Sequence, residues 1–144
     1  MVFKTGPMAI ERRSSAFGAR SAAHFSCGQI EMFFELETFA GTGVQGTQDG
    51  AAAVAMLDTP SWIASVPTGA VYVTETFSNG IRKIENGMVS TLTSRADGNA
   101  DGPLSTALFR GPSGIVSDRM GNLYVGDQNN HRIRKIDVSG VVTT

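Results

Sequence analysis

The chain has 144 residues, of which 41% are hydrophobic, which is enough to bury the core of one ordinary domain and excludes disorder throughout. Charged residues make up 17% and the net charge is −1, so the chain lacks the basic excess typical of nucleic-acid-binding domains. The single cysteine, Cys27, excludes both an internal disulfide and a cysteine-built metal cage.

Residues 1–37 differ in composition from residues 38–144 and are predicted to form a leader. Before position 31 they hold four basic residues and one acid, Glu11. This composition is typical of an organellar transit peptide, and a poorly ordered leader is the alternative. No apolar run reaches the roughly 18–20 residues of a transmembrane helix. We therefore expect no membrane insertion and a cytoplasmic location, with organellar import from residues 1–30 as the other possibility.

The rest of the chain contains an internal repeat with an offset of 52 residues. Comparing residues 49–85 with 101–137 without a gap gives 14 identities in 37 positions. Chance would give two or three. The register then slips by one residue at Gly87 and Gly140, where an insertion between strands costs little. Repeats of this period indicate a repeat architecture.

Each repeat reads as short strands separated by turns. In the second copy we expect strands at 115–116, 123–125, 132–136 and from 141 onward, with turns at 118–122, 127–130 and 139–140. The period-two pattern of 132–136 places Ile133 in the core and Arg134 in solvent. Truncating Ile133 or Tyr124 to alanine is accordingly expected to cost more stability than truncating Arg134. Four antiparallel strands in about 50 residues make one β-propeller blade.

The connectors ahead of the strands are also repeated. Residues 51–57 and 103–109 are rich in alanine and leucine, and Pro103 suits the first turn of a helix. We therefore expect a short helical turn between blades in each repeat, ended by Pro60 and Pro112.

These residues resemble the NHL repeat family. The second copy carries the stretches that match the family pattern, namely Asp101-Gly102, Pro112-Ser113-Gly114-Ile115, Gly121-Asn122-Leu123-Tyr124-Val125 and Asn130 to Asp137. The first copy departs from it at Glu75, Phe77-Ser78 and Asn79-Gly80. The resemblance implies an all-β partial β-propeller over residues 38–144, with about two four-stranded antiparallel blades (repeats about 38–90 and 91–144).

Propellers of this family serve several purposes, so the resemblance leaves the function open. We expect a non-catalytic module for protein or ligand interaction. One alternative is a fragment of a lyase- or lactonase-like enzyme whose active-site residues lie in other blades. The other is an RNA-binding propeller. Because two blades cannot close a ring, we also expect self-association through unpaired blade edges or a multi-chain ring.

Four motifs suggest chemistry, and each has a structural explanation that we prefer. Residues 41–46 fit the dinucleotide pattern G-x-G-x-x-G but lack a βαβ unit, so an inter-blade loop is favoured. Residues 97–102 resemble half of a calcium loop, but position twelve is Leu108 rather than glutamate. His24 and His131 are too few for a catalytic zinc site. The repeated acids Glu75 and Asp127 suggest a structural role at a strand end. We therefore predict no catalytic residues, no metal and no cofactor, and assign no binding residues.

The basic pairs Arg82-Lys83 and Arg134-Lys135 are the remaining candidates for nucleic-acid contact. Residues 38–144 hold eight basic and nine acidic side chains, so these pairs are interpreted as solvated strand faces. A nucleic-acid partner is thus disfavoured and a protein partner expected. The predicted core contains Tyr72, Tyr124, Trp62, Leu57, Phe109 and the strand isoleucines and valines.

Overall fold

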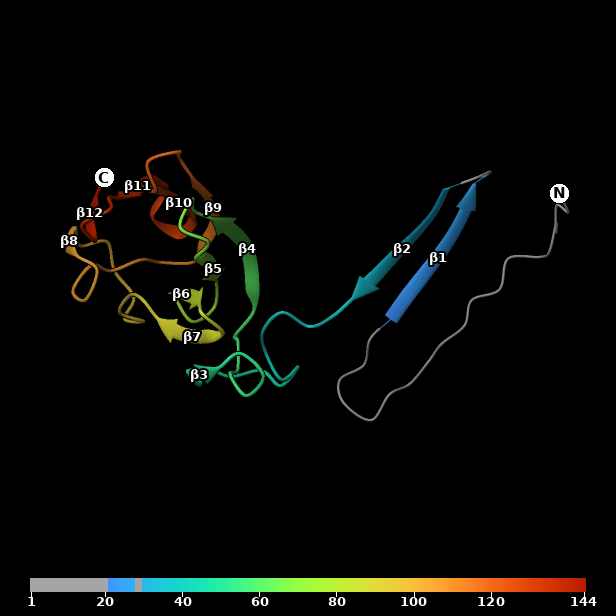
Figure 1. The fold of residues 1–144 in the computed structure, drawn as a ribbon. Coiled ribbons are helices and arrows are strands. Elements are labelled where there is room, and N and C mark those ends of the chain that lie inside the picture. Colours follow the sequence, from blue (N-terminus) through green and yellow to red (C-terminus); the bar gives the residue numbers. More distant parts are fainter. Residues whose placement is uncertain (1–20, 28–29) are drawn as a thin grey trace, which may run out of the picture. The chain divides into compact units, whose positions relative to one another are not determined.

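The computed structural model describes residues 21–27 and 30–144, and the chain divides into two compact units, Met1–Phe39 and Ala40–Thr144. In the first unit, β1 (Ser21–Cys27) pairs antiparallel with β2 (Ile30–Leu36), as Figure 1 shows. The basic residues of the predicted leader, at positions 4 to 20, lie outside the described residues. The assignment of 1–37 as a leader therefore stays a prediction.

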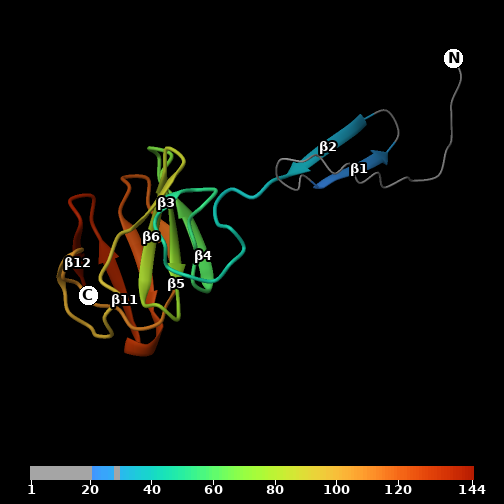
Figure 2. The same cartoon turned by 90° about the horizontal axis from the view of Figure 1, so that it is seen from below.

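The second unit consists of two successive antiparallel sheets, blade 1 and blade 2 (Figures 1 and 2). Blade 1 has the order β3-β7-β6-β5-β4, with β3 (Gly50–Ala51), β4 (Pro60–Ser65), β5 (Val71–Glu75), β6 (Gly80–Glu85) and β7 (Met88–Thr91). Blade 2 has the order β8-β12-β11-β10-β9, with β8 (Gly102–Pro103), β9 (Pro112–Ser117), β10 (Leu123–Asp127), β11 (Arg132–Ile136) and β12 (Val141–Thr143). The all-β class and the partial propeller of two blades are confirmed.

The fifth strand of each sheet comes from the segment that leads into the blade. Gly50 and Gly102 turn this segment onto the outer edge with φ values of 138° and 126°, which side chains other than hydrogen disfavour. Each connector then makes one helical turn, in which the amide of Ala55 donates to Ala51 O at 2.9 Å and that of Ala107 to Pro103 O at 2.8 Å. Within the described part of the chain, no helix is long and apolar enough to cross a membrane.

Tight hairpins connect the strands at the positions that the turn residues predict. Asn86 and Gly87 both have positive φ (50° and 73°), which makes a two-residue hairpin between β6 and β7. In blade 2, the amide of Asp118 donates to Asn122 O at 2.9 Å and closes the predicted turn between β9 and β10. A short 3-10 helix, η1 (Gln128–Asn130), connects β10 to β11.

The core lies mainly between the two blades. Its buried members come from both, and they include Ala64, Ala70, Ile81, Phe109, Ile115, Val125 and Ile136. A smaller cluster within blade 1 joins Val73, Ile84 and Val89 to Ala55 of the connector. Phe109 is thus a core residue as predicted, and Tyr72 and Leu57 pack against the core while partly buried.

Several predicted core positions are wrong, because Trp62, Ile63, Val116 and Ile133 are all exposed. Trp62 is exposed, and its counterpart in the repeat is Gly114, so this position of the blade does not hold a large side chain in the core. Ile133 is 67% exposed whereas Arg134 is fully buried, the reverse of the expectation. The face of β11 that carries Arg134 packs against the connector and blade 1. Ile133 points from the opposite face, which no other described segment covers.

Candidate functional site

Arg134 is fully buried in blade 2 and ties the strands to the connector. Its Nη1 donates to Asp127 Oδ2 at 2.9 Å and to Leu108 O at 3.0 Å. Its Nη2 donates to Asp101 Oδ1 at 2.6 Å and to Ala100 O at 2.8 Å. The guanidinium also lies 5.0 Å from the ring centre of Phe109. Asp127 is fully buried as well, so the two charges compensate each other away from water.

Blade 1 contains the same network 52 residues earlier. Arg82 Nη1 donates to Glu75 Oε1 at 2.8 Å and to Met56 O at 2.9 Å. Its Nη2 donates to Asp49 Oδ1 at 2.6 Å and to Gln48 O at 3.1 Å. The longer glutamate of blade 1 therefore replaces the aspartate of blade 2 without changing the network.

The acids of the network also hold backbone amides. Asp127 accepts the amide of Arg110 at 2.7 Å. Asp101 accepts both the amide and the hydroxyl of Thr144. Burial raises the pKa of Asp101, but the hydrogen bonds from Arg134 and Thr144 outweigh it, so the pKa lies below its ordinary value. These acids therefore connect the arginines to backbone amides of neighbouring segments, and the structural role of Glu75 and Asp127 stays a prediction.

The basic pairs are only half solvated. Lys83 and Lys135 are partly exposed, but Arg82 and Arg134 are fully buried, so the prediction of fully solvated pairs is wrong. The hydropathy pattern does not reveal this, because the compensating acids lie 7 and 33 residues away in the sequence. One signal in the sequence could have revealed the buried arginines. Two acids and an arginine recur together 52 residues apart, as Asp49, Glu75 and Arg82 and again as Asp101, Asp127 and Arg134.

The other sequence motifs lie in structural turns. Residues 41–46 form an irregular loop in which the amide of Gly46 donates to Leu57 O. In the calcium-like stretch, Asp97 pairs with Arg110 at 3.3 Å, and Asp101 belongs to the arginine network. His131 ends η1 in the left-handed conformation, with its amide donating to Gln128 O. In the part of the chain that the structure describes, no three His, Cys, Asp or Glu side chains gather as metal ligands.

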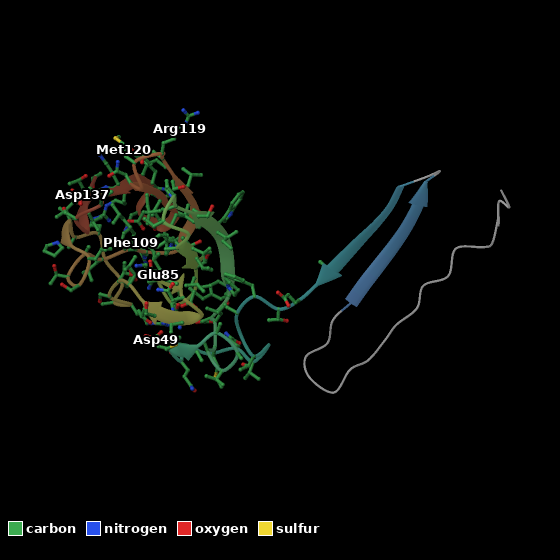
Figure 3. The ribbon with its side chains drawn as sticks, viewed as in Figure 1. Asp49, Glu85, Phe109, Arg119, Met120 and Asp137 are labelled. Atoms are coloured by element: carbon green, nitrogen blue, oxygen red, sulfur yellow. The ribbon has the colours of Figure 1, made fainter. Side chains whose placement is uncertain are left out.

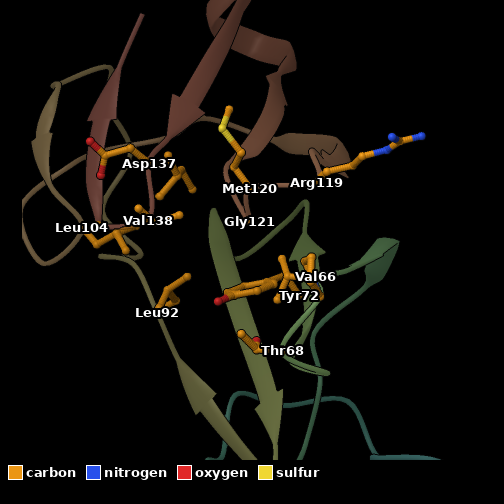
Figure 4. A pocket seen from close by; sticks show the side chains of 13 residues that line it. Val66, Thr68, Tyr72, Leu92, Leu104, Arg119, Met120, Gly121, Asp137 and Val138 are labelled. Atoms are coloured by element: carbon orange, nitrogen blue, oxygen red, sulfur yellow. The ribbon is translucent and has the colours of Figure 1, made fainter.

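A cleft of about 280 Å³ lies between the blades, at the end where the β4–β5, β9–β10 and β11–β12 hairpins meet. Figure 4 shows Val66 and Tyr72 on one side and Met120 and Gly121 on the other. Its wall is mostly apolar, with the side chains of Val66, Tyr72, Leu92, Leu104, Ile136 and Val138. The cleft is therefore a place where an apolar group can leave water.

Aspartates hold the two hairpins of blade 2 that form the rim. Asp118 accepts the amides of Met120 and Asn122, each at 2.9 Å, and Asp137 accepts the amides of Ser139 and Val141. A side-chain hydrogen bond lowers the pKa of each, from Asn122 for Asp118 and from Ser139 for Asp137. The rim loops are therefore preorganised by their own hydrogen bonds.

Three exposed side chains lie at the rim of this cleft. Met120 and Val138 are apolar turn residues that are about three-quarters exposed, and Arg119 is exposed beside them. In Figure 3, Arg119 and Met120 project away from the blades. Within residues 36–144 no acid pairs with Arg119. Sequence reasoning missed this site, although apolar residues inside two hairpin turns, where polar ones are usual, are a detectable signal.

Comparison with known proteins identifies the repeat. The model of the NHL repeat matches residues 109–136. The chain is 30% identical over 97 residues to the protein SUPPRESSOR OF QUENCHING 1, chloroplastic, of Arabidopsis thaliana. That match covers 65% of this chain and 9% of the Arabidopsis protein.

Solved structures share the fold. A proposed phosphatase from Bacteroides thetaiotaomicron has a TM-score of 0.64 at 25% identity, covering 78% of this chain and 28% of its own. An auxiliary nutrient binding protein from the same organism has a TM-score of 0.60 at 24% identity, covering 82% and 32%. The chain thus spans less than a tenth of the curated relative and about three-tenths of these structures.

Proposed function

We propose, from the premise that this chain belongs to the NHL-repeat family and forms two blades of a β-propeller, that it is a non-catalytic protein-binding module. Its ligand is a protein segment that inserts one apolar side chain into the cleft between the blades. An acidic residue beside that side chain pairs with Arg119.

The cleft carries this proposal. At about 280 Å³ it lies below the roughly 300–1,000 Å³ of pockets that enclose a small-molecule ligand, which favours a single anchoring side chain. Met120 and Val138 extend the apolar surface beyond the cleft, as expected where a partner covers the rim. Anchoring side chains surrounded by such a rim supply most of the binding energy of protein interfaces.

The charged residues favour this function over the two alternatives. Glu75 and Asp127, the repeated acids, are each bound to a buried arginine and are not available as a general acid or base. Arg82 and Arg134 are equally unavailable to the phosphates of RNA. Residues 38–144 hold nine acidic and eight basic side chains, which leaves no basic excess for the phosphates of RNA.

A peptide selection tests the proposal. A phage-displayed library of random peptides is selected on the full chain, and enriched peptides are measured by fluorescence polarisation. We expect enrichment of a large aliphatic or aromatic residue next to Asp or Glu. Arg119→Glu and Val138→Asp are each expected to weaken binding at least tenfold.

The control is Phe77→Ser, which removes an exposed apolar side chain from the β5–β6 loop, at the opposite end of the strands. It is expected to leave peptide affinity unchanged. If no peptide is enriched, or if both cleft variants bind as tightly as the parent chain, the proposed function is wrong.

A further inference from the structure

Two tyrosines occupy the same position of the two repeats, and only one of their hydroxyls has a hydrogen-bond partner. Tyr72 lies on β5 of blade 1, and Tyr124 lies on β10 of blade 2, 52 residues later. The hydroxyl of Tyr124 donates to Asp118 Oδ2 at 3.4 Å. Between residues 36 and 144, no group forms a hydrogen bond with the hydroxyl of Tyr72. The two hydroxyls therefore differ in what they are free to bind.

The turn before each tyrosine explains the difference. In blade 2, Asp118 accepts hydrogen bonds from Asn122 Nδ2 at 2.7 Å and from the hydroxyl of Tyr124. In blade 1, the counterparts of Asp118 and Asn122 are Val66 and Ala70, which are buried in the core between the blades. Two apolar side chains thus replace two polar ones, and the tyrosine of blade 1 is left without an acceptor.

The turn of blade 1 keeps its backbone hydrogen bonds without the aspartate. The amide of Val66 donates to Ala70 O at 3.0 Å, and that of Gly69 donates to Val66 O at 2.9 Å. The equivalent bonds of blade 2 measure 2.9 Å and 3.1 Å. The replacement therefore preserves the turn and alters the wall of the cleft, which Val66 and Tyr72 both line.

The unpaired hydroxyl of Tyr72 lies at this cleft and is open to solvent. The ring of Tyr72 packs against the core while partly buried. In Figure 4, the hydroxyl is at the end of the ring that points to the side on which Leu92 lies. Buried side-chain atoms without a hydrogen bond are, among the described residues, nitrogens of Arg82, Arg95 and Arg134 only. A ligand that fills the cleft therefore takes the Tyr72 hydroxyl out of water.

A ligand that covers this hydroxyl has to provide it with a partner. A hydroxyl that is buried without a hydrogen bond costs more than an ordinary hydrogen bond gains, so a hydrocarbon side chain is penalised here. The wall around the hydroxyl is mostly apolar, with Val66, Leu92, Leu104, Ile136 and Val138. The side chain that enters the cleft therefore needs an apolar body and a polar tip.

Tyrosine meets both requirements. Its ring is apolar, and its hydroxyl can accept one hydrogen bond while donating another. Tryptophan has a donor only, and glutamine brings two N–H donors into a mostly apolar wall. A carboxylate buried beside Tyr72 would need a cation, but Lys83, which faces Tyr72 across β5 and β6, is already paired with Glu85 at 2.7 Å.

We propose that the side chain which enters the cleft is a tyrosine of the protein ligand, and that its hydroxyl oxygen accepts a hydrogen bond from the hydroxyl of Tyr72. This inference rests on the proposed function and names the residue that fills the same cleft. Val66 determines the specificity, because an aspartate in its place would hold the Tyr72 hydroxyl within blade 1, as Asp118 holds that of Tyr124.

Three peptides that differ at one position test the inference. Each is a short fluorescein-labelled peptide of glycine and serine with a single aspartate, and the residue before the aspartate is tyrosine, phenylalanine or glutamine. Binding to the full chain is measured by fluorescence polarisation. The tyrosine peptide is expected to bind about tenfold more tightly than either of the others, because it alone combines an apolar ring with an acceptor for the Tyr72 hydroxyl.

Two matched variants locate the preference. Tyr72→Phe removes the unpaired hydroxyl and is expected to bind the tyrosine and phenylalanine peptides within about twofold of each other. It is expected to keep the circular dichroism of the parent chain, because this hydroxyl has no hydrogen bond to lose. Tyr124→Phe removes the equivalent hydroxyl of blade 2 and is expected to retain the full preference for tyrosine.

The outcomes separate this inference from the proposed function. Equal binding of the tyrosine and phenylalanine peptides, with both weakened by Val138→Asp, would overturn the tyrosine and leave the binding cleft in place. A preference for tyrosine that survives Tyr72→Phe would overturn the role of Tyr72. A glutamine peptide that binds as tightly as the tyrosine peptide would overturn the choice of tyrosine. If none of the three peptides binds, both the inference and the proposed function are wrong.

Discussion

Truncating Arg134 to alanine is expected to destabilise the chain far more than truncating its neighbour Ile133. Without the guanidinium, the fully buried Asp127 loses its charged partner, and Asp101, Leu108 O and Ala100 O lose a donor. Breaking a buried ion pair from one side costs about 3–5 kcal/mol. Ile133 is mostly exposed, so Ile133→Ala is expected to cost under about 1 kcal/mol.

Urea unfolding followed by far-ultraviolet circular dichroism measures the difference. With a slope of about 2 kcal/mol per molar urea, a loss of about 4 kcal/mol lowers the midpoint by about 2 M. All variants are compared at one protein concentration, because association adds to apparent stability.

Two further variants serve as controls for the comparison of Arg134→Ala with Ile133→Ala. Arg134→Lys keeps the charge but not the two-pronged donor, so its midpoint should lie between those of the parent chain and Arg134→Ala. Ile81→Ala, at the buried counterpart of Ile133, is expected to cost about 2–5 kcal/mol. Equal midpoints for Ile133→Ala and Arg134→Ala would refute the assignment of the two faces of β11.

Two other predictions concern the turns. The folded-state pKa of Asp137 is lowered from 3.8 by its hydrogen bonds, so its contribution is complete above about pH 5 and is lost as pH falls through the lowered pKa. The urea midpoint should therefore fall less between pH 6 and pH 3 in Asp137→Asn than in the parent chain; parallel profiles would contradict this. Gly102→Ala, at a φ of 126°, should cost about 1–3 kcal/mol, whereas Gly114→Ala, where an added Cβ meets no atom within 4 Å, should stay within about 0.5 kcal/mol; equal losses would count against backbone strain at Gly102.

The architecture could be predicted from the sequence because each strand and turn is indicated twice, once in each copy of the repeat. The strands at 123–125 and 132–136 and the turn at 118–122 all lie where the turn residues and apolar runs place them. These features depend on neighbours in sequence, which local patterns record.

The side-chain positions were less predictable, because they depend on what covers each face. Alternation within 132–136 is real, but it does not tell which face is covered. Both faces of a blade strand are covered where blades have neighbours on either side. Here Arg134 is the buried residue because Asp127 of β10 and Asp101 of the lead-in segment accept its hydrogen bonds. The cleft was missed for a similar reason, since three hairpins and two blades contribute to it.

The two repeats differ in length by one residue in a single hairpin, and this difference leaves the charged network of the blade unchanged. Blade 1 closes β6 and β7 with Asn86-Gly87, while blade 2 uses a loop one residue longer that carries Val138 to the cleft. Despite the insertion, Thr91 and Thr144 reach equivalent positions, each bound to the aspartate of its lead-in segment. The loop can therefore change length and composition, and with them the ligand preference of the proposed binding cleft, while the charged network keeps the strands in register.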